Sequence, residues 1–343
     1  MRGAMSALAE SEGRSSPAWR FPQPYGWRSG ATAALVAAVL LFTGHRVELD
    51  RALVMTGDAV AAAAGSGRPS QVAAGFSTVA RQLFPLQLDE RTDIDRIENF
   101  DSRRLPPFAH VETTTVRSRE LNPNTLLLED RFDRKAVLVQ PFGYAFKVGQ
   151  KLLETLEIAL WGTMIAIVFG LPLALLSAQN LRFGRMAYYA SRAVVGLCRA
   201  VPELISALFL VLAYGFGPIA GVLALAIHSV GFLGKFYAED IENADPKPQE
   251  ALIAIGAGRL KVFRHAILPQ VMPQYIAYTL YILDRNVRMA TVIGLVGAGG
   301  IGQELKGRYD MYNYGHVGTI LVAIFLLVLI LDQLASHLRR AVI

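Results

Sequence analysis

The sequence carries little charge for its length and only one cysteine. Acidic and basic residues make up 18% of its 343 positions, whereas soluble domains usually contain about a quarter. Instead, 53% of the residues are hydrophobic, and they gather into long runs of the kind that cross bilayers. The lone Cys198 excludes an internal disulfide bond. An ordinary soluble domain is therefore excluded as a description of the whole chain.

Motifs for nucleotide, metal and nucleic-acid chemistry are also missing. The pattern Gly-x-x-x-x-Gly-Lys-Ser/Thr occurs nowhere, so we expect ATP hydrolysis to come from another polypeptide. The six histidines are scattered singly, which argues against a metal site and against an intramembrane enzyme. The net charge of +6 forms no basic patch on a soluble domain, so no nucleic acid partner is expected. We expect this chain to bind no cofactor itself.

Long apolar runs are what the sequence does contain. They predict an all-α polytopic membrane protein with about six transmembrane helices, at residues 31–43, 156–178, 194–214, 219–236, 272–296 and 317–334. Arginines precede the first run, and Arg339 and Arg340 follow the last. Short basic segments stay in the cytoplasm, so both termini are expected there. No internal repeat is visible, which argues against a secondary transporter.

These runs divide the chain into four stretches. We expect a cytoplasmic tail at 1–29, a first transmembrane anchor at 30–45, an extracytoplasmic segment at 46–151 and a membrane core with five transmembrane helices at 152–343. The anchor run is short, and a signal-peptide core is the alternative. The extracytoplasmic segment includes a heavily charged stretch at 89–104, and short helices at 60–64 and 72–84 are the only structure predicted in it.

A polar stretch at 239–270 separates the fourth run from the fifth. It contains Glu250-Ala251-Leu252, Gly256, Ala266 and Leu268-Pro269. Apart from Leu252 and Ala266, this spacing matches the cytoplasmic loop Glu-Ala-Ala, three residues, Gly, nine residues, Ile-x-Leu-Pro of ABC importer permeases. We expect a helix to begin near Gln249, Gly256 to end it, and a second helical piece to follow at 259–265. An amphipathic loop lying on lipid headgroups is the alternative.

Over residues 151–340 the chain resembles the permeases of phosphonate and phosphite importers. The resemblance rests on residues 154–156 (Glu-Thr-Leu), 199–204 (Arg-Ala-Val-Pro-Glu-Leu), 217–221, 228–235 and, most distinctively, 286–302. It implies that 152–343 is the permease core of a bacterial inner-membrane importer for phosphonate, phosphite or a related oxyanion. A permease for methionine or phosphate is the alternative. The extracytoplasmic segment is longer than is usual in this family.

The resemblance also implies partners. A cytoplasmic ABC ATPase would hold ATP and Mg²⁺ and would bind the polar stretch, here called the coupling loop. The coupling residues would be Glu250, Ala251, Gly256, Ala257, Gly258, Leu268 and Pro269. A soluble binding protein would deliver the substrate outside, and two copies of the chain would form the pathway within the bilayer.

Charged and polar residues in the fifth run are candidates for the pathway. Ionisable groups inside a membrane span are costly and by default indicate function. Asp284 and Arg288 are spaced to pair on one helix face, which is the structural alternative. We expect Arg285 or Arg288 to offer its planar guanidinium to the transported anion, with Asn286 and Thr291 nearby.

Two further groups of residues are candidates for a gate. Arg199 and Glu203 are spaced to pair near the end of the third run, either as a gate or as a helix-end contact. Gly297, Gly299 and Gly300 belong to a stretch that fits the dinucleotide fingerprint, but that fingerprint requires a preceding strand. We instead expect this glycine-rich backbone either to let two helix ends approach closely or to interrupt the helix. His228 is expected to be a hydrogen-bonded packing residue.

Overall fold

The computed structural model describes residues 26–65, 70–97, 100–101, 105–121, 128–181 and 184–342. The chain forms two compact units, Met1–Ala80 and Arg81–Ile343, and most of the predicted tail at 1–29 lies outside the described residues. The first unit holds α2, α3 and most of α4, at Trp27–Arg46, Leu49–Ala63 and Gln71–Leu83. The predicted anchor falls within α2, which is long and apolar enough to cross a bilayer. The short helices predicted at 60–64 and 72–84 overlap α3 and α4.

An antiparallel sheet opens the second unit, where the sequence predicted nothing beyond short helices. Strands β1, β2 and β3 lie at Glu90–Asp93, His110–Leu121 and Leu128–Gln140 in the order β1-β3-β2, with a 3-10 turn at Ile94–Arg96. The β2–β3 pairing runs from His110 opposite Val139 to Leu121 opposite Leu128. Among the strand residues whose burial is described, Val137, Leu138 and Val139 are the buried apolar ones. Charged residues interrupt the rest of both strands, so their pattern resembles a solvated loop.

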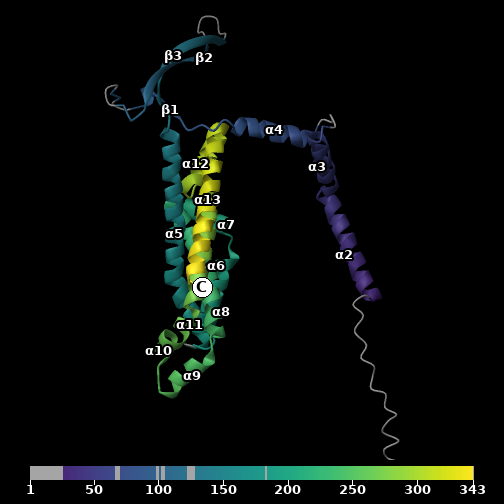
Figure 1. Ribbon diagram of the computed structural model, residues 1–343, viewed down its shortest axis with the longest axis vertical. Helices are drawn as coiled ribbons and strands as arrows, with labels where there is room; N and C mark the ends of the chain where they lie inside the picture. Colours follow the sequence, from purple (N-terminus) through teal and green to yellow (C-terminus); the bar gives the residue numbers. More distant parts are fainter. Residues whose placement is uncertain are drawn as a thin grey trace, which may run out of the picture. The chain divides into compact units, whose positions relative to one another are not determined.

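Long helices build the remainder of the second unit (Figure 1). Their bounds are α5 Gly143–Ser177, α6 Arg185–Ala200, α7 Glu203–Tyr214, α8 Pro218–Asn243, α9 Pro246–Ala254, α10 Arg259–Val262, α11 Leu268–Gly294, α12 Gly300–Asp310 and α13 Tyr314–Val342. A π-helical turn at Phe263–Ile267 joins α10 to α11. α5 and α8 pack closely because Gly162 leaves room at their crossing, where a Cβ would stand 3.0 Å from the Cβ of Leu225.

The third predicted span, 194–214, is broken. α6 and α7 meet at a bend of 90°. Val201 is extended (φ −86°, ψ 121°) and Pro202 precedes the first turn of α7. The residue before a proline avoids the helical conformation, so α6 ends there, and the span predicted at 194–214 consists of two helices joined at a bend. The break leaves Glu203 at the start of a new helix.

The predicted all-α, polytopic architecture of the membrane core is confirmed. Among the described helices, α2, α5, α8 and α13 are long and apolar enough to cross a bilayer, and the α6–α7 pair adds a fifth span if counted as one. The remaining predicted span, α11, has 27 residues, about 40 Å of helix. It carries three charged side chains but buries Ile282, Val287 and Ile293, and it packs against α5, α8 and α13.

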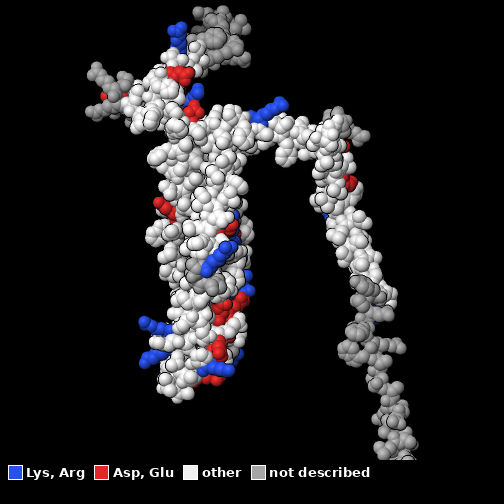
Figure 2. All heavy atoms as spheres, viewed as in Figure 1, with Lys and Arg blue, Asp and Glu red and all other residues white. Residues whose placement is uncertain are grey.

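Charged side chains are unevenly distributed over the second unit. They gather around the end of the bundle that carries α9 and α10, while much of the helical surface above it is uncharged (Figure 2). A largely uncharged band is what a bilayer requires of the surface that faces it. The coupling loop therefore lies at a polar end of the bundle.

Candidate functional site

The coupling loop forms a helix, a tight turn and a second helix. α9 begins at Pro246, earlier than the predicted start near Gln249. Its N-cap is Asp245, whose carboxylate accepts a hydrogen bond from the backbone N–H of Lys247 at 3.0 Å. Gly256 ends the segment with φ +81°, as the sequence predicted, because glycine adopts this left-handed conformation without strain. α10 and the π-helical turn then cover the second helical piece predicted at 259–265.

The tip of the coupling loop exposes apolar side chains. Ile253, Ile255 and Leu260 are 60%, 79% and 70% exposed, and Glu250 and Ala251 are also exposed. A charge-surrounded apolar knob of this kind is typical of a protein interaction site rather than of a free surface. The structure therefore exposes Glu250, Ala251, Gly256 and Gly258 among the predicted coupling residues.

The base of the coupling loop is fixed to the bundle. Gln249 is buried and donates to the carbonyl oxygens of Ala244 and Asp245 at 3.2 and 3.1 Å. Phe263 and Ile267 are buried in the same apolar cluster as Tyr237. Leu268 and Pro269 form the first turn of α11, so the loop runs directly into that helix. The base of the coupling loop is therefore in packed contact with α11.

A charge cluster joins α7, α8 and α11 inside the bundle. Arg285 donates to the carboxylate of Glu203, and its Nη2 lies 3.0 Å from Nε2 of His228. The same His228 nitrogen lies 3.1 Å from Glu203, while Nδ1 lies 3.2 Å from the carbonyl oxygen of Val201. The Arg285 guanidinium also covers the ring of Phe232 at 4.8 Å. His228 is thus hydrogen-bonded, as expected, and it also belongs to an ionic group that the sequence did not reveal.

The other pathway candidates lie in different surroundings. Arg288 donates to Asp284 at 2.5 Å, the pairing that the sequence spacing allows. Asn286 is 2% exposed, and its Nδ2 donates to Thr163 at 2.9 Å and to Ser229 at 3.0 Å. Thr291, five residues further along α11, donates to the carbonyl oxygen of Arg288 at 2.6 Å. Arg285 and Asn286 therefore face neighbouring helices, and the hydrogen bonds of Asn286 link α11 to α5 and α8.

The predicted pairing of Arg199 with Glu203 was wrong. The break at Pro202 turns α7 away from α6, and the Glu203 carboxylate instead meets Arg285 and His228. Arg199 lies over the ring of Phe232 at 5.1 Å. Arg199 and Arg285 thus contact the same ring, that of Phe232. The sequence patterns place Arg199 among the gate candidates and Arg285 among the pathway candidates.

The glycine-rich stretch forms a tight turn that ends α11. Gly297, Gly299 and Gly300 have φ of +92°, +84° and +71°. Gly300 donates its N–H to the carboxylate of Glu154 at 3.0 Å, and Ile301 donates to Thr155 at 2.8 Å. A helix rather than a strand precedes this turn, which removes the dinucleotide interpretation. The chain breaks here as expected, and the turn is fixed to α5.

A second ionic group lies where β1, α5 and α12 meet, and no sequence pattern predicted it. Glu304 contacts Arg308 at 2.9 Å and Lys147 at 3.3 Å, and Arg308 also lies 3.6 Å from Glu90. Burial alone would raise the pKa of Glu304, but the hydrogen bond from Arg308 and the charge of Lys147 hold it below its usual value. These pairs fix the sheet to the helices.

Comparisons with known proteins agree with this arrangement. The family described as "Binding-protein-dependent transport system inner membrane component" matches residues 170–343. The "Putative phosphite transport system permease protein HtxE" of Stutzerimonas stutzeri is 54% identical over 261 residues, which is 76% of this chain and 100% of that protein. The "Phosphate-import permease protein PhnE" of Mycolicibacterium smegmatis is 40% identical over 55% of this chain and 36% of its own length.

Among solved structures, an inward-facing MetNI methionine ABC transporter has the same fold. The TM-score is 0.50 and the identity 23%, over 57% of this chain and 96% of that one. The likeness extends to the fold alone. Together with the family match over half of the chain, it agrees with the helical core described above. The chain therefore belongs to the family of binding-protein-dependent transport system inner membrane components, and it is the multi-pass permease subunit of an ABC importer of the inner membrane.

Proposed function

We propose that this permease carries phosphite, phosphonate or a related phosphorus oxyanion into the cell. The observation that carries the proposal is the 54% identity to the "Putative phosphite transport system permease protein HtxE" of S. stutzeri over that protein's full length. The bundle supports it chemically, because Arg285 and Arg288 place guanidinium groups on one membrane helix. A guanidinium presents paired donors that match the oxygens of such an anion.

Arg285 is the stronger candidate for the pathway. Its Nη1 is buried and finds no hydrogen-bond partner among the residues that the structure describes. A buried donor without a partner is costly, and an anion would satisfy it. In this state Glu203 occupies the other side of the guanidinium. We infer that Glu203 holds Arg285 until the anion competes for it, with Arg288 kept on Asp284.

Substitution separates a pathway role from a structural one. Uptake is measured in Arg285→Ala and Arg288→Ala proteins that still reach the membrane and assemble. The proposal predicts a large loss of uptake for Arg285→Ala and a smaller loss for Arg288→Ala. Normal uptake in both proteins would contradict a pathway role for either arginine.

The exposed knob of the coupling loop supports a role in ATPase binding. Its coupling residues would insert into a cleft of a cytoplasmic ABC ATPase, which would bind ATP and Mg²⁺ in place of this chain. Closure of that partner would move α11, because Leu268 and Pro269 continue the loop into the helix. This movement would shift the pathway between its inward- and outward-facing states.

The assembly around the permease is proposed on the same basis. A soluble binding protein would deliver the anion outside, and two copies of this chain would enclose the pathway. Leu204, Leu208 and Leu212 on α7 are exposed and would face lipid or the second copy. Both termini would lie in the cytoplasm, on the side of the coupling loop.

A phosphate permease is the second candidate, favoured by the 40% identity to the phosphate-import protein of M. smegmatis. Uptake of phosphite, methylphosphonate, phosphate and methionine is compared in cells that lack and then regain this chain. Phosphite or methylphosphonate uptake that returns with the chain supports the first proposal. Return of phosphate uptake alone supports the second.

A further inference from the structure

A small cavity lies beside the charge cluster, between the end of α5, α6 and α8. Its volume is about 150 Å³, and its lining comes from all three helices. Binding pockets for drug-sized molecules are larger, about 300–1,000 Å³. This cavity, here called the α6–α8 pocket, has room for a small ion and its waters.

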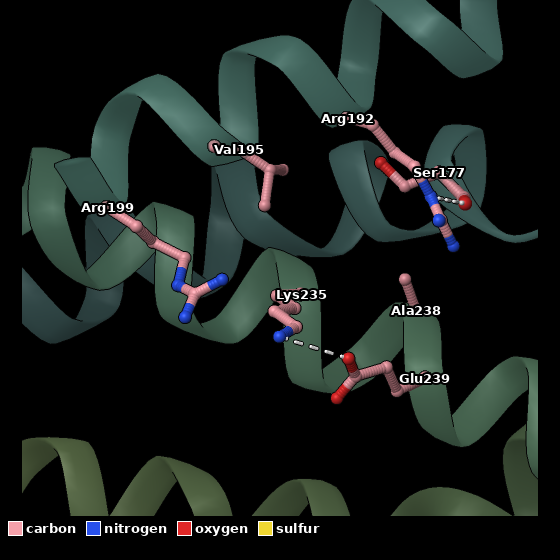
Figure 3. A pocket seen from close by; sticks show the side chains of 8 residues that line it. Ser177, Arg192, Val195, Arg199, Lys235, Ala238 and Glu239 are labelled. Atoms are coloured by element: carbon pink, nitrogen blue, oxygen red, sulfur yellow. Dashed lines mark hydrogen bonds and ion pairs between the residues drawn. The ribbon is translucent and has the colours of Figure 1, made fainter.

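Three cationic side chains line the α6–α8 pocket (Figure 3). Two of them have partners. Arg192 pairs with Glu242 at 2.8 Å and donates Nε to the carbonyl oxygen of Ser177 at 3.3 Å. Lys235 reaches Glu239, its neighbour on the next turn of α8, at 3.3 Å. Arg192 and Lys235 remain 43% and 41% exposed in these pairs, and Glu239 lines the pocket as well.

The third cation, Arg199, is different. Its Nε is buried and has no hydrogen-bond partner in the described part of the chain, where no acidic side chain pairs with it either. Two contacts with α8 fix the position of the Arg199 side chain. Its Cγ packs against Gly231, where a Cβ would stand only 2.6 Å away, and its guanidinium lies over the ring of Phe232. A partly buried charge without a counterion is unfavourable, and the pocket beside it is the open space that a counterion would fill.

We propose that the α6–α8 pocket binds the oxygens of a phosphate-type anion, with Arg199 as the principal donor and Arg192 and Lys235 as supporting charges. A guanidinium and two further cations suit a doubly charged tetrahedral anion better than a halide, because paired donors match paired oxygens. The anion is either a free phosphorus oxyanion or the phosphate of a lipid headgroup. The choice of a phosphorus anion rests on the proposed function.

The place of the pocket gives the free anion a role. Arg199 and Arg285 contact the same ring, that of Phe232. Lys235 follows His228 by about two turns of α8, roughly 10 Å further toward the coupling loop. An anion in the pocket therefore lies between the charge cluster and the coupling-loop end. It would be an exit-side site, occupied after the anion leaves Arg285.

Binding is tested on the full chain purified in a detergent free of phospholipid. Line broadening of the ³¹P NMR signals of phosphite and phosphate reports binding without requiring transport. The proposal predicts binding that Arg199→Gln weakens about tenfold or more and that Arg199→Lys restores in part. The control is Arg185→Gln, an exposed arginine at the start of α6, which should leave binding unchanged. Size-exclusion profiles identify variants that fail to fold.

A second experiment tests whether the ligand is the phosphate of a lipid headgroup. Native mass spectrometry counts phosphatidylglycerol retained by the same proteins, and Arg199→Gln should remove one bound lipid if the headgroup is the ligand. Binding of neither probe, or equal binding by Arg199→Gln and Arg185→Gln, would overturn the site. If the site is overturned in this way but wild-type cells still take up phosphite normally, the proposed function stands. Binding at Arg199 without any phosphite uptake would instead remove the proposed function and keep the pocket.

Discussion

Glu203, in the first turn of α7, accepts a hydrogen bond from Arg285 in the middle of α11, across 82 positions of sequence. This pair connects two irregular features of the bundle. The break after Val201 frees Glu203 from α6, and the charge in α11 finds a counterion there. The charge-assisted pair is therefore a structural contact between α7 and α11.

Removing one partner of the Glu203–Arg285 pair should lower stability strongly, whereas removing both partners should lower it by less than the sum of the two single losses. Glu203→Gln and Arg285→Gln each leave one buried charge unpaired, and each is expected to lower stability by about 3–5 kcal/mol. The double variant should lose less than the sum, because no unpaired charge remains between the two positions. Thermal unfolding of the four proteins in one detergent measures this coupling. Strictly additive losses would show that the pair contributes no coupling.

Asn286 should contribute to stability, whereas Thr291 should not. Asn286→Ala removes the hydrogen bonds to Thr163 and Ser229 and is expected to cost about 1–3 kcal/mol. Thr291→Ala removes a hydroxyl bonded within its own helix and should change stability by less than about 0.5 kcal/mol. Both are measured by thermal unfolding. Equal effects would contradict the role of Asn286 in linking the helices.

Two glycines of α12 should respond oppositely to alanine. At Gly300 φ is +71° and a Cβ would lie 2.6 Å from Oγ1 of Thr155, so Gly300→Ala is expected to cost about 1–3 kcal/mol. At Gly307 a Cβ meets nothing within 4 Å, and Gly307→Ala should stabilise the helix by up to about 1 kcal/mol. The melting temperatures of the two variants decide the matter. A loss at Gly307 as large as that at Gly300 would contradict the account of the turn.

The coupling knob should bind its ATPase through apolar contact. Ile255→Asp places a charge at the most exposed apolar position of the knob and is expected to reduce co-purification of the ATPase subunit at least tenfold. Phe108→Asp makes the same kind of change at an exposed site beside β2 and should have no effect on it. Quantitative pull-down from membranes measures both. Retention of the ATPase by Ile255→Asp would exclude the knob from the interface.

Hydropathy predicts the long helices because burial in lipid and apolar periodicity act over many residues. It fails where local geometry decides. Pro202 lies in an apolar run, and composition alone does not show whether a proline bends or breaks the helix. Charged residues are frequent in both β2 and β3, so only the pairing itself distinguishes these strands from a loop.

Partners distant in sequence limit the prediction of the site in the same way. Spacing on one helix shows that Asp284 can meet Arg288, and the structure contains that pair. Spacing also allows Arg199 to meet Glu203, but the break excludes it. The contacts of Glu203 with Arg285 and His228 arise only when three helices pack together, and no single helix pattern contains them.

The measurement that bears most directly on the transport proposal is uptake of radiolabelled phosphite by cells in which this chain is deleted and then restored. We expect uptake to disappear on deletion, to return with the wild-type chain and to stay absent with Arg285→Ala expressed at the same level in the membrane. Phosphite uptake that is unaffected by deletion, or that Arg285→Ala restores in full, would contradict the transport proposal.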